Sequence, residues 1–142
     1  MNAARSAVTV DVPPERLYAL ITDFDTYPTF VPNQSAVRVL SHEGDRWRVE
    51  FELSIVKTLR YTLDLVGEPG RSLSWTLVSG DMMRAMTGGW TLEALPDGRT
   101  RATYALDVEL KGFVPRSVSR SLVERTLPAN LEAFKNEAER RG

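Results

Sequence analysis

Arg84, Tyr61 and Tyr104 are the side chains of this sequence that could act on a carbonyl compound. Arg84 shares the numbering parity of Met82 and Met86, and alternate residues of a strand point to the same face of a sheet. A guanidinium on an apolar face needs a carboxylate or a ligand oxygen as its partner, because burying an unpaired charge is costly. In that position Arg84 could polarise a carbonyl or stabilise an enolate, and the two tyrosine hydroxyls could bond a ketone or quinone oxygen.

An alternative for Arg84 comes from the paired glycines Gly88-Gly89 in the same segment. Paired glycines inside a strand are typical of a bulge or a sharp bend, and a bulge there would reset the parity and turn Arg84 toward water. No helix start with a lysine follows them, so a nucleotide-binding loop is not indicated. The sequence alone leaves both faces open for Arg84.

Several other kinds of active site are excluded by composition. His42 is the only histidine and the chain has no cysteine, which argues against zinc sites, histidine-based triads and thiol nucleophiles. His42 falls in the predicted turn "SHEGD" and is expected at the surface. Asp23 and Asp25 flank another turn, where carboxylates are usually solvated, so acid–base chemistry is not expected from them. We predict neither a metal nor a cofactor.

A sheet is the element that must position the candidate side chains. From residue 36 to residue 110 apolar and polar residues alternate, which is the period of a strand with one buried face. Short Gly/Pro/Asp connections at 42–45, 67–70 and 95–98 separate the runs. The pattern predicts an antiparallel meander of about six or seven strands, preceded by a first strand near the N-terminus.

Helical patterns lie at both ends of the chain. Residues 13–24 begin with two prolines and carry apolar residues at helical spacing, which predicts a short amphipathic helix. Residues 114–141 predict a long C-terminal helix with Pro128 in its interior, where a proline removes a hydrogen bond and kinks the helix. Between the first helix and the sheet, the stretch "DFDTYPTFVP" at 23–32 is expected to be a turn whose aromatic residues pack at the rim of a pocket.

One long helix is too narrow to cover the concave face of a strongly curved sheet. We therefore predict an apolar pocket of about a few hundred Å³ between the two layers. The expected fold class is α+β, in a single domain that spans residues 1–142.

The order of these elements resembles the START-like (SRPBCC) superfamily, which has the helix-grip fold, and in particular its polyketide cyclase/dehydrase and coenzyme Q-binding branch. The similarity lies in a helix that ends at Asp23, in Tyr27-Pro28 and in the segment 30–32, "FVP". The Gly-Gly-Trp triplet at 88–90 and the stretch 95–106 add to it. At 33–34 this chain has Asn-Gln where the coenzyme Q-binding group has Trp-Cys. The resemblance implies a pocket for a hydrophobic ligand but no fixed catalytic set, because the superfamily includes carriers, cyclases and regulators.

Apolar and aromatic residues of the concave face, together with the helix residues that oppose them, form the predicted ligand-binding set. Aromatic rings there would stack on a flat ring, and the methionines would form an adaptable wall, although core packing explains the same pattern. The set is Tyr27, Phe30, Phe51, Tyr61, Leu63, Trp75, Met82, Arg84, Met86, Trp90, Tyr104, Leu122, Leu127 and Leu131, with Arg84, Tyr61 and Tyr104 as the catalytic candidates.

Charge and hydropathy set limits on partners and location. The net charge is −1 and no run of about 18 apolar residues occurs, so we expect no DNA binding, no transmembrane segment and a cytoplasmic protein. Lys111, Arg116 and Arg120 could meet an anionic partner such as a lipid head group, an acidic carrier protein or RNA, or could simply form a solvated face.

Three functions follow from these patterns taken together with what the resemblance implies. The first is a carrier that binds a lipid, a quinone or a polyketide in the cavity. The second is an aromatase/cyclase-type polyketide cyclase/dehydrase. The third is a regulatory module that associates with the ribosome or another macromolecule.

Overall fold

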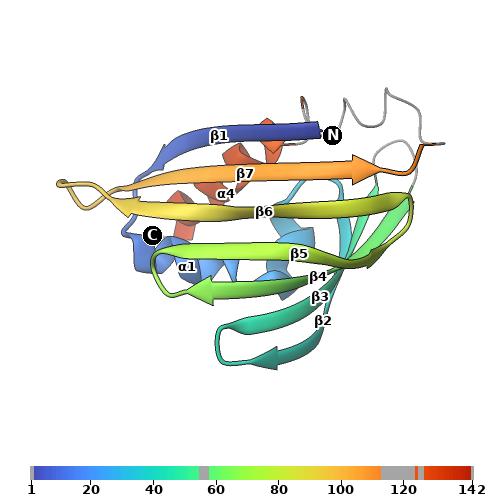
Figure 1. The fold of residues 1–142 in the computed structure, drawn as a ribbon. Coiled ribbons are helices and arrows are strands. Elements are labelled where there is room, and N and C mark those ends of the chain that lie inside the picture. Colours follow the sequence, from blue (N-terminus) through green and yellow to red (C-terminus); the bar gives the residue numbers. More distant parts are fainter. Residues whose placement is uncertain (1, 55–57, 113–123, 125–126, 142) are drawn as a thin grey trace.

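A seven-stranded antiparallel sheet is the main element of the structure, a computed structural model that describes residues 2–54, 58–112, 124 and 127–141. The strand order is β1-β7-β6-β5-β4-β3-β2, so the first strand of the chain pairs with the last and the others form a continuous meander (Figure 1). The strands are β1 (Asn2–Val10), β2 (Gln34–Glu43), β3 (Arg46–Ser54), β4 (Thr58–Glu68), β5 (Ser72–Gly80), β6 (Met83–Ala94) and β7 (Thr100–Leu110).

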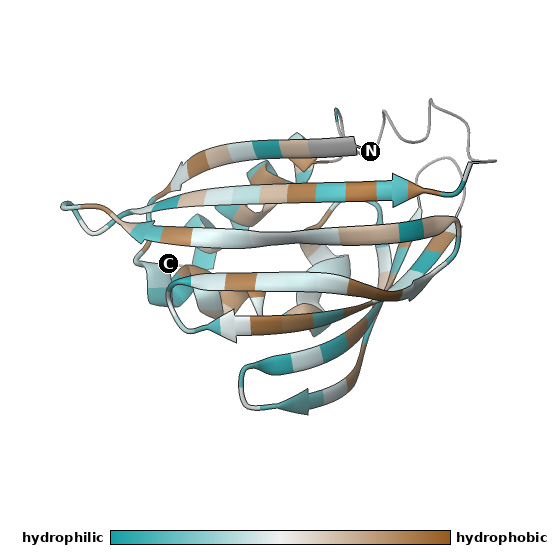
Figure 2. Ribbon diagram, in the orientation of Figure 1, coloured by the Kyte–Doolittle hydropathy of each residue, from teal (hydrophilic) through white to brown (hydrophobic). Residues whose placement is uncertain are grey.

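Alternation along the strands produces one apolar face and one polar face. In β3 the buried residues are Trp47, Val49, Phe51 and Leu53, and the residues between them are exposed or half-buried. The hydropathy colours alternate along several strands in the same way (Figure 2). On the outer face, ion pairs such as Arg48–Asp64, with Nε and Oδ1 2.7 Å apart, link neighbouring strands. The predicted meander is therefore confirmed, with its apolar face inward.

The described helices all lie on the inner side of the sheet, behind the strands in the view of Figure 1. They are α1 (Pro14–Ile21), the short 3-10 helix η1 (Phe24–Thr26), α2 (Tyr27–Phe30) and α4 (Leu127–Arg141). Pro14 occupies the first turn of α1, where its missing N–H has no helical partner to lose. α4 contacts β1 and α1, and buries Leu127, Leu131, Phe134 and Ala138. The α+β helix-grip fold predicted from the sequence is thus confirmed.

The described part of the C-terminal helix is α4 (Leu127–Arg141), with Pro128 as its second residue. The kink predicted at Pro128 concerns the turn that precedes it, so it stays a prediction. Most of the predicted helix before Leu127 lies outside the described residues.

A shift of strand register occurs at the start of β6. The pairing of β6 with β7 skips a residue between Met83 and Ala85 and then runs regularly through Gly88 and Gly89. The bulge expected at the two glycines is therefore found near Met83. Met82, immediately before the strand, has a φ of 60°, in the left-handed region used by tight turns.

Candidate ligand-binding cavity

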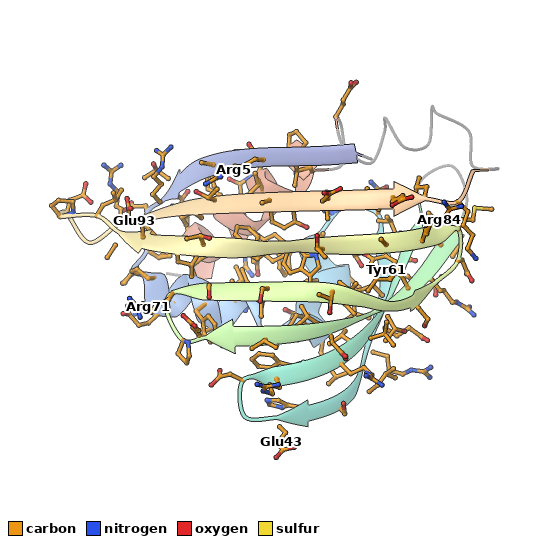
Figure 3. The ribbon with its side chains drawn as sticks, in the orientation of Figure 1. Arg5, Glu43, Tyr61, Arg71, Arg84 and Glu93 are labelled. Carbon is orange, nitrogen blue, oxygen red and sulfur yellow. The ribbon has the colours of Figure 1, made fainter. Side chains whose placement is uncertain are left out.

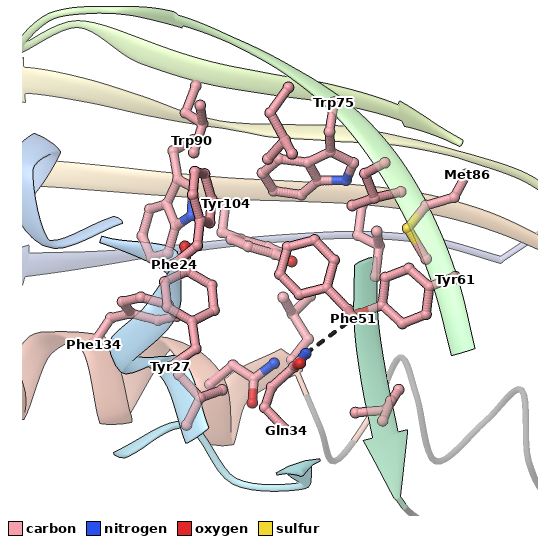
Figure 4. A pocket seen from close by; sticks show the side chains of 18 residues that line it. Phe24, Tyr27, Gln34, Phe51, Tyr61, Trp75, Met86, Trp90, Tyr104 and Phe134 are labelled. Carbon is pink, nitrogen blue, oxygen red and sulfur yellow. Dashed lines mark hydrogen bonds between the residues drawn. The ribbon is translucent and has the colours of Figure 1, made fainter. Parts of the chain in front are cut away.

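A cavity of about 90 Å³ lies between the inner face of the sheet and the helices. It is smaller than the few hundred Å³ predicted from the sequence, because aromatic rings from both layers project into the space (Figure 4). From the sheet, the lining residues are Gln34, Phe51, Leu53, Tyr61, Leu63, Leu65, Leu73, Trp75, Met86, Trp90, Tyr104 and Leu106. From the helical side, they are Phe24, Tyr27, Val31, Leu127, Asn130 and Phe134.

The helical wall of the cavity is built from aromatic contacts between α4 and the segment 23–32. The ring of Phe134 meets the rings of Tyr27 and Trp90 edge-on, with centroids 5.1 and 5.2 Å apart, so α4 is attached both to this segment and to the sheet. Tyr27 donates a hydrogen bond from its hydroxyl to the carbonyl of Ile21, which ties α2 back to α1. The stretch "DFDTYPTFVP" therefore forms one side of the cavity.

An ion pair and a cation–π contact attach the end of α4 to the same segment. Arg141 lies with Nη1 3.4 Å from Oδ2 of Asp23, and its guanidinium carbon lies 5.9 Å from the centroid of the Phe30 ring. Asp23 is partly exposed and pairs across the surface, as expected for a carboxylate that is not part of an acid–base centre.

Polar atoms are few in the cavity, and no Asp, Glu, Lys, Arg or His of the described residues lines it. Gln34 donates from Nε2 to the hydroxyl of Tyr61 over 3.3 Å. Three buried atoms have no hydrogen-bond partner in the described part of the chain: Gln34 Oε1, Trp75 Nε1 and Asn130 Oδ1. All three belong to residues that line this cavity.

The tyrosines of the cavity are protonated phenols. Burial raises the pKa of Tyr61 to about 12, and the hydrogen bond from Gln34 only partly offsets this rise. Burial, followed by the electrostatic influence of Tyr61, also raises the pKa of Tyr104, and burial raises that of Tyr27. At neutral pH these hydroxyls can donate hydrogen bonds to a ligand oxygen but cannot serve as bases.

Most of the predicted ligand-binding residues come together in this cavity. Those that line it are Tyr27, Phe51, Tyr61, Leu63, Trp75, Met86, Trp90, Tyr104 and Leu127. Phe30 and Leu131 pack in or against the core next to it without lining it. Met82 sits in the turn before β6, and Leu122 lies outside the described residues. Placement in the cavity does not establish that a residue binds a ligand, which remains a prediction.

Of the two faces that the sequence left open for Arg84, the structure shows the outer one, so the inner-face position considered for a catalytic or ligand-binding role is not found. Its side chain is 62% exposed, and Nη1 lies 3.5 Å from Oε1 of Glu109 on the neighbouring strand. Figure 3 shows it at the margin of the sheet. The register shift between Met83 and Ala85 is the physical cause, because it turns Arg84 outward before the regular alternation resumes at Met86. The alternative of a water-facing Arg84 is correct, although the irregularity lies closer to Arg84 than the glycines do.

Gln34, Asn130 and Phe134 were not predicted as cavity residues. Gln34 starts β2 and Asn130 lies in α4, and both are polar residues that a search for apolar periodicity does not select. Phe134 does belong to the apolar stripe of the C-terminal helix, so its helical spacing was the signal that could have identified it.

His42 lies on the surface, as expected. Its ring stacks on Trp47 with centroids 5.0 Å apart, and Nε2 lies 2.7 Å from the carbonyl oxygen of Gly44. Within the described residues, no group of three or more His, Cys, Asp or Glu side chains could hold a metal ion. In the same part of the chain, no helix has the length and apolar character needed to cross a membrane.

The sheet, its gripping helix and the cavity between them define a START-like helix-grip protein. The sequence carries the identification further: residues 10–135 match the family described as polyketide cyclase / dehydrase and lipid transport, so the chain belongs to that family. This description covers both the cyclase and the lipid carrier considered from the sequence. The resemblance to the superfamily is confirmed.

Two relatives show how varied the similar proteins are. The chain is 30% identical over 136 residues to the granaticin polyketide synthase bifunctional cyclase/dehydratase of Streptomyces violaceoruber, covering 92% of this chain but only 40% of that protein. It is 28% identical over 133 residues to the ribosome association toxin RatA of Pseudomonas aeruginosa, covering 92% of this chain and 90% of that protein.

Solved structures share the fold at low sequence identity. The ZhuI aromatase/cyclase of Streptomyces sp. R1128 superposes with a TM-score of 0.88 at 21% identity, covering 98% of this chain and 94% of that one. A START superfamily protein of Mycobacterium smegmatis superposes with a TM-score of 0.86 at 20% identity, over the full length of both chains.

Proposed function

We propose that this protein is a carrier that binds an uncharged, hydrophobic small molecule in the cavity between the sheet and α4. The observation that supports the proposal is the character of the wall: apolar and aromatic residues from both layers, and no charged side chain among the described residues that line it. Burying a charge in such a site costs several kcal/mol, so anionic ligands would be bound poorly. Membership of a family described by polyketide chemistry and lipid transport agrees with this proposal.

Apolar burial supplies the binding energy. A ring compound that loses about 200 Å² of apolar surface gains roughly 5 kcal/mol at about 25 cal/mol per Å², before the cost of association is subtracted. The cavity of about 90 Å³ lies below the volumes usual for ligand sites, so side chains of the wall must move to admit a whole ring. Met86 is suited to this because its unbranched side chain adapts readily.

A matched pair of variants tests the proposal. Leu65 lines the cavity, whereas Val66 is the next residue of β4 and is exposed on the opposite face. Native mass spectrometry of protein purified from its own host is expected to show a retained hydrophobic compound in the parent and in Val66→Trp. Leu65→Trp is expected to lack it while keeping the circular dichroism spectrum of the parent. Retention of the same compound by a folded Leu65→Trp protein would contradict binding in this cavity.

Cyclisation and dehydration of a carrier-bound polyketide is the second candidate, and the granaticin relative is the observation that favours it. Confinement in the cavity would fold the polyketide chain of the substrate. Tyr61 or Tyr104 would donate a hydrogen bond to its ketone oxygen as negative charge develops there. It ranks second because no side chain of the described wall can act as a base at neutral pH. The test is turnover of a carrier-bound polyketide by the parent, Tyr61→Phe and Tyr104→Phe; a parent rate equal to the uncatalysed rate would exclude it.

An anionic macromolecular partner is a proposal that rests on sequence alone. Lys111 is exposed beyond the end of β7, and Arg116 and Arg120 lie outside the described residues. The relative named for ribosome association motivates the test. If reversal of all three residues to Glu leaves co-sedimentation with ribosomes unchanged, this proposal has no basis. A cytoplasmic location likewise remains a proposal.

A further inference from the structure

Among the described residues, the buried side-chain atoms without a hydrogen-bond partner belong to residues that line one cavity. Gln34 Oε1, Trp75 Nε1 and Asn130 Oδ1 are the buried side-chain atoms without a partner in the described part of the chain. All three residues line the cavity, and they come from β2, β5 and α4. Gln34 and Trp75 are at least nine-tenths buried, at 9% and 7% exposure. In Figure 4 Trp75 lies at the top of the view and Gln34 at the bottom, with the rings of Phe51 and Tyr104 between them.

Buried polar groups without partners are costly, and proteins seldom keep them without a reason. Each such group costs about 1–3 kcal/mol relative to a paired one. These atoms are fully covered by neighbouring side chains in the small cavity described above. A wall that moves apart to admit a ligand would uncover them, and a ligand with matching polar atoms would then pair them.

The chemistry of two of these groups, Trp75 and Gln34, specifies what would pair them. The indole N–H of Trp75 is only a donor, so it requires an acceptor such as a ketone oxygen. Gln34 already uses one end of its carboxamide to bond Tyr61, and the other end is left for the ligand. A hydroxyl group can donate and accept, so it satisfies a carboxamide in either orientation. The described residues of the wall offer no charged partner for an ionised group.

From these observations we infer that the cavity selects an uncharged ring compound with a ketone oxygen and a hydroxyl group on opposite edges. The indole N–H of Trp75 donates a hydrogen bond to the ketone oxygen, and the carboxamide of Gln34 forms a hydrogen bond with the hydroxyl group. A plain hydrocarbon or a fatty acid lacks one or both groups, or brings a charge. This inference rests on the proposed function, because it assigns the ligand class to the same cavity.

A set of ligands with one carbon skeleton tests the inference. The set contains tetralin, 1-tetralone with the ketone alone, 5,6,7,8-tetrahydro-2-naphthol with the hydroxyl alone, and 6-hydroxy-1-tetralone with both. Dissociation constants are measured by calorimetry at pH 6, where the phenols are protonated. The acid 5,6,7,8-tetrahydro-2-naphthoate serves as the anionic member of the set. We define the ketone preference as Kd of tetralin divided by Kd of 1-tetralone, and the hydroxyl preference in the same way for the naphthol.

Two variants are each expected to lower one of these preferences and to leave the other unchanged. Trp75→Phe keeps a ring but loses the N–H donor, and is expected to lower the ketone preference about 3- to 10-fold while leaving the hydroxyl preference unchanged. Gln34→Met keeps the length of the side chain but loses the carboxamide, and is expected to do the reverse. Met86→Leu, an apolar exchange of similar volume in the same wall, is expected to change all affinities by a common factor. Thermal unfolding of each variant shows that it is folded.

The outcomes separate this inference from the proposed function. The inference is supported if Trp75→Phe lowers only the ketone preference, Gln34→Met lowers only the hydroxyl preference, and the anionic compound binds the parent at least about 10-fold more weakly than the naphthol. If the four neutral compounds bind but neither preference changes in either variant, the inference is overturned and hydrophobic binding stands. Tightest binding by the naphthoate would also overturn it. If none of the compounds binds the parent, both the inference and the proposed function fail.

Discussion

Gly88 shows at the scale of a single residue how the cavity wall is shaped. A Cβ at this position would lie 2.5 Å from the carbonyl oxygen of Ala105 and 3.0 Å from two ring atoms of Trp75. Real Cβ atoms essentially never come within 3.0 Å of another atom, so any larger residue here would have to displace the backbone of β7 or the indole of Trp75. The Gly-Gly pair in the sequence therefore reflects close packing next to the cavity and not a bulge.

Substitution of Gly88 is expected to move the Trp75 ring. Gly88→Ala should lower the free energy of unfolding by about 1–3 kcal/mol, because the added methyl group overpacks a filled site. It should also change the tryptophan fluorescence spectrum. Urea unfolding with fluorescence detection measures both effects. Gly112→Ala is the control, since a Cβ there meets nothing within 4 Å. Equal stability of the two variants would show that the indole adjusts freely.

The carboxyl group of Glu137 is expected to make the stability of the fold decrease as the pH falls. Hydrogen bonds from Arg140 and Arg141 lower the pKa of its carboxyl group to about 2. Because the pKa is lower in the folded state, the stabilisation is fully present above the unfolded pKa of about 4.3 and is lost as the pH falls toward 2. Glu137→Gln should therefore cost stability at pH 7 but nothing near pH 2. The cost should be about 1 kcal/mol at most, because both arginines are solvent-exposed.

Thermal unfolding between pH 2 and pH 7 checks this dependence. Glu132→Gln is the matched control, because Glu132 lies on the exposed side of the same helix. A stability difference between the parent and Glu137→Gln that stays constant over this range would contradict the assignment.

At the scale of elements, one ring of α4 contacts both the segment 23–32 and the sheet. Phe134 meets Tyr27, Phe30 and Trp90 with centroids 5.1 to 5.2 Å apart, so it joins the helix to the segment 23–32 and to β6. This ring is also part of the cavity wall. The position of the helix and the size of the cavity thus depend on the same side chain.

Shortening the side chain of Phe134 is expected to lower the stability of the fold and, at the same time, to enlarge the cavity for bigger ligands. Phe134→Leu should lose about 1–2 kcal/mol of stability, from burial and ring contacts that leucine cannot replace. It should also lower the dissociation constant of a three-ring ligand relative to a two-ring ligand, because space opens beside the cavity. Calorimetry with 1-tetralone and anthrone measures this ratio. Asn136→Ala, an exposed position of α4, should change neither quantity. An unchanged ratio in Phe134→Leu would show that the wall closes over the lost volume.

The elements were more predictable than the orientation of particular residues. Alternation alone located β3, β4, β5 and β7, because apolar and polar residues alternate along the sequence of each strand. The numbering parity of Arg84 did not predict which face of the sheet it occupies. A one-residue register shift at the start of β6 depends on how β7 pairs with it, and the local sequence does not show this pairing.

The site was predictable in its apolar part only. Residues such as Phe51, Tyr61 and Trp75 follow from the inner parity of the meander. Gln34 and Asn130 could not be identified, because their burial results from contacts between elements distant in the sequence. The volume was overestimated for the same reason: rings from α4 and from the segment 23–32 meet over the sheet, and sequence does not show how far they interlock.

At the scale of the whole molecule, the ligand would lie between two layers that share no strand or helix. The cavity takes residues from β2 to β7 on one side and from η1, α2 and α4 on the other. A molecule bound there contacts both layers and stabilises their association, so its effect should appear throughout the fold and not only at the site.

Hydrogen exchange and thermal unfolding together test this last point. At 100 times its Kd, 6-hydroxy-1-tetralone should add about 2.7 kcal/mol to the free energy of unfolding and raise Tm by roughly 5–11 °C. Amide exchange should slow in β5 and β6 as well as in α4, because a ligand held between the layers must be released before either can open. Val66→Trp should respond like the parent, and Leu65→Trp should not respond. Slower exchange in α4 alone, with the strands unaffected, would place the ligand on the outside of the helix and would contradict binding between the layers.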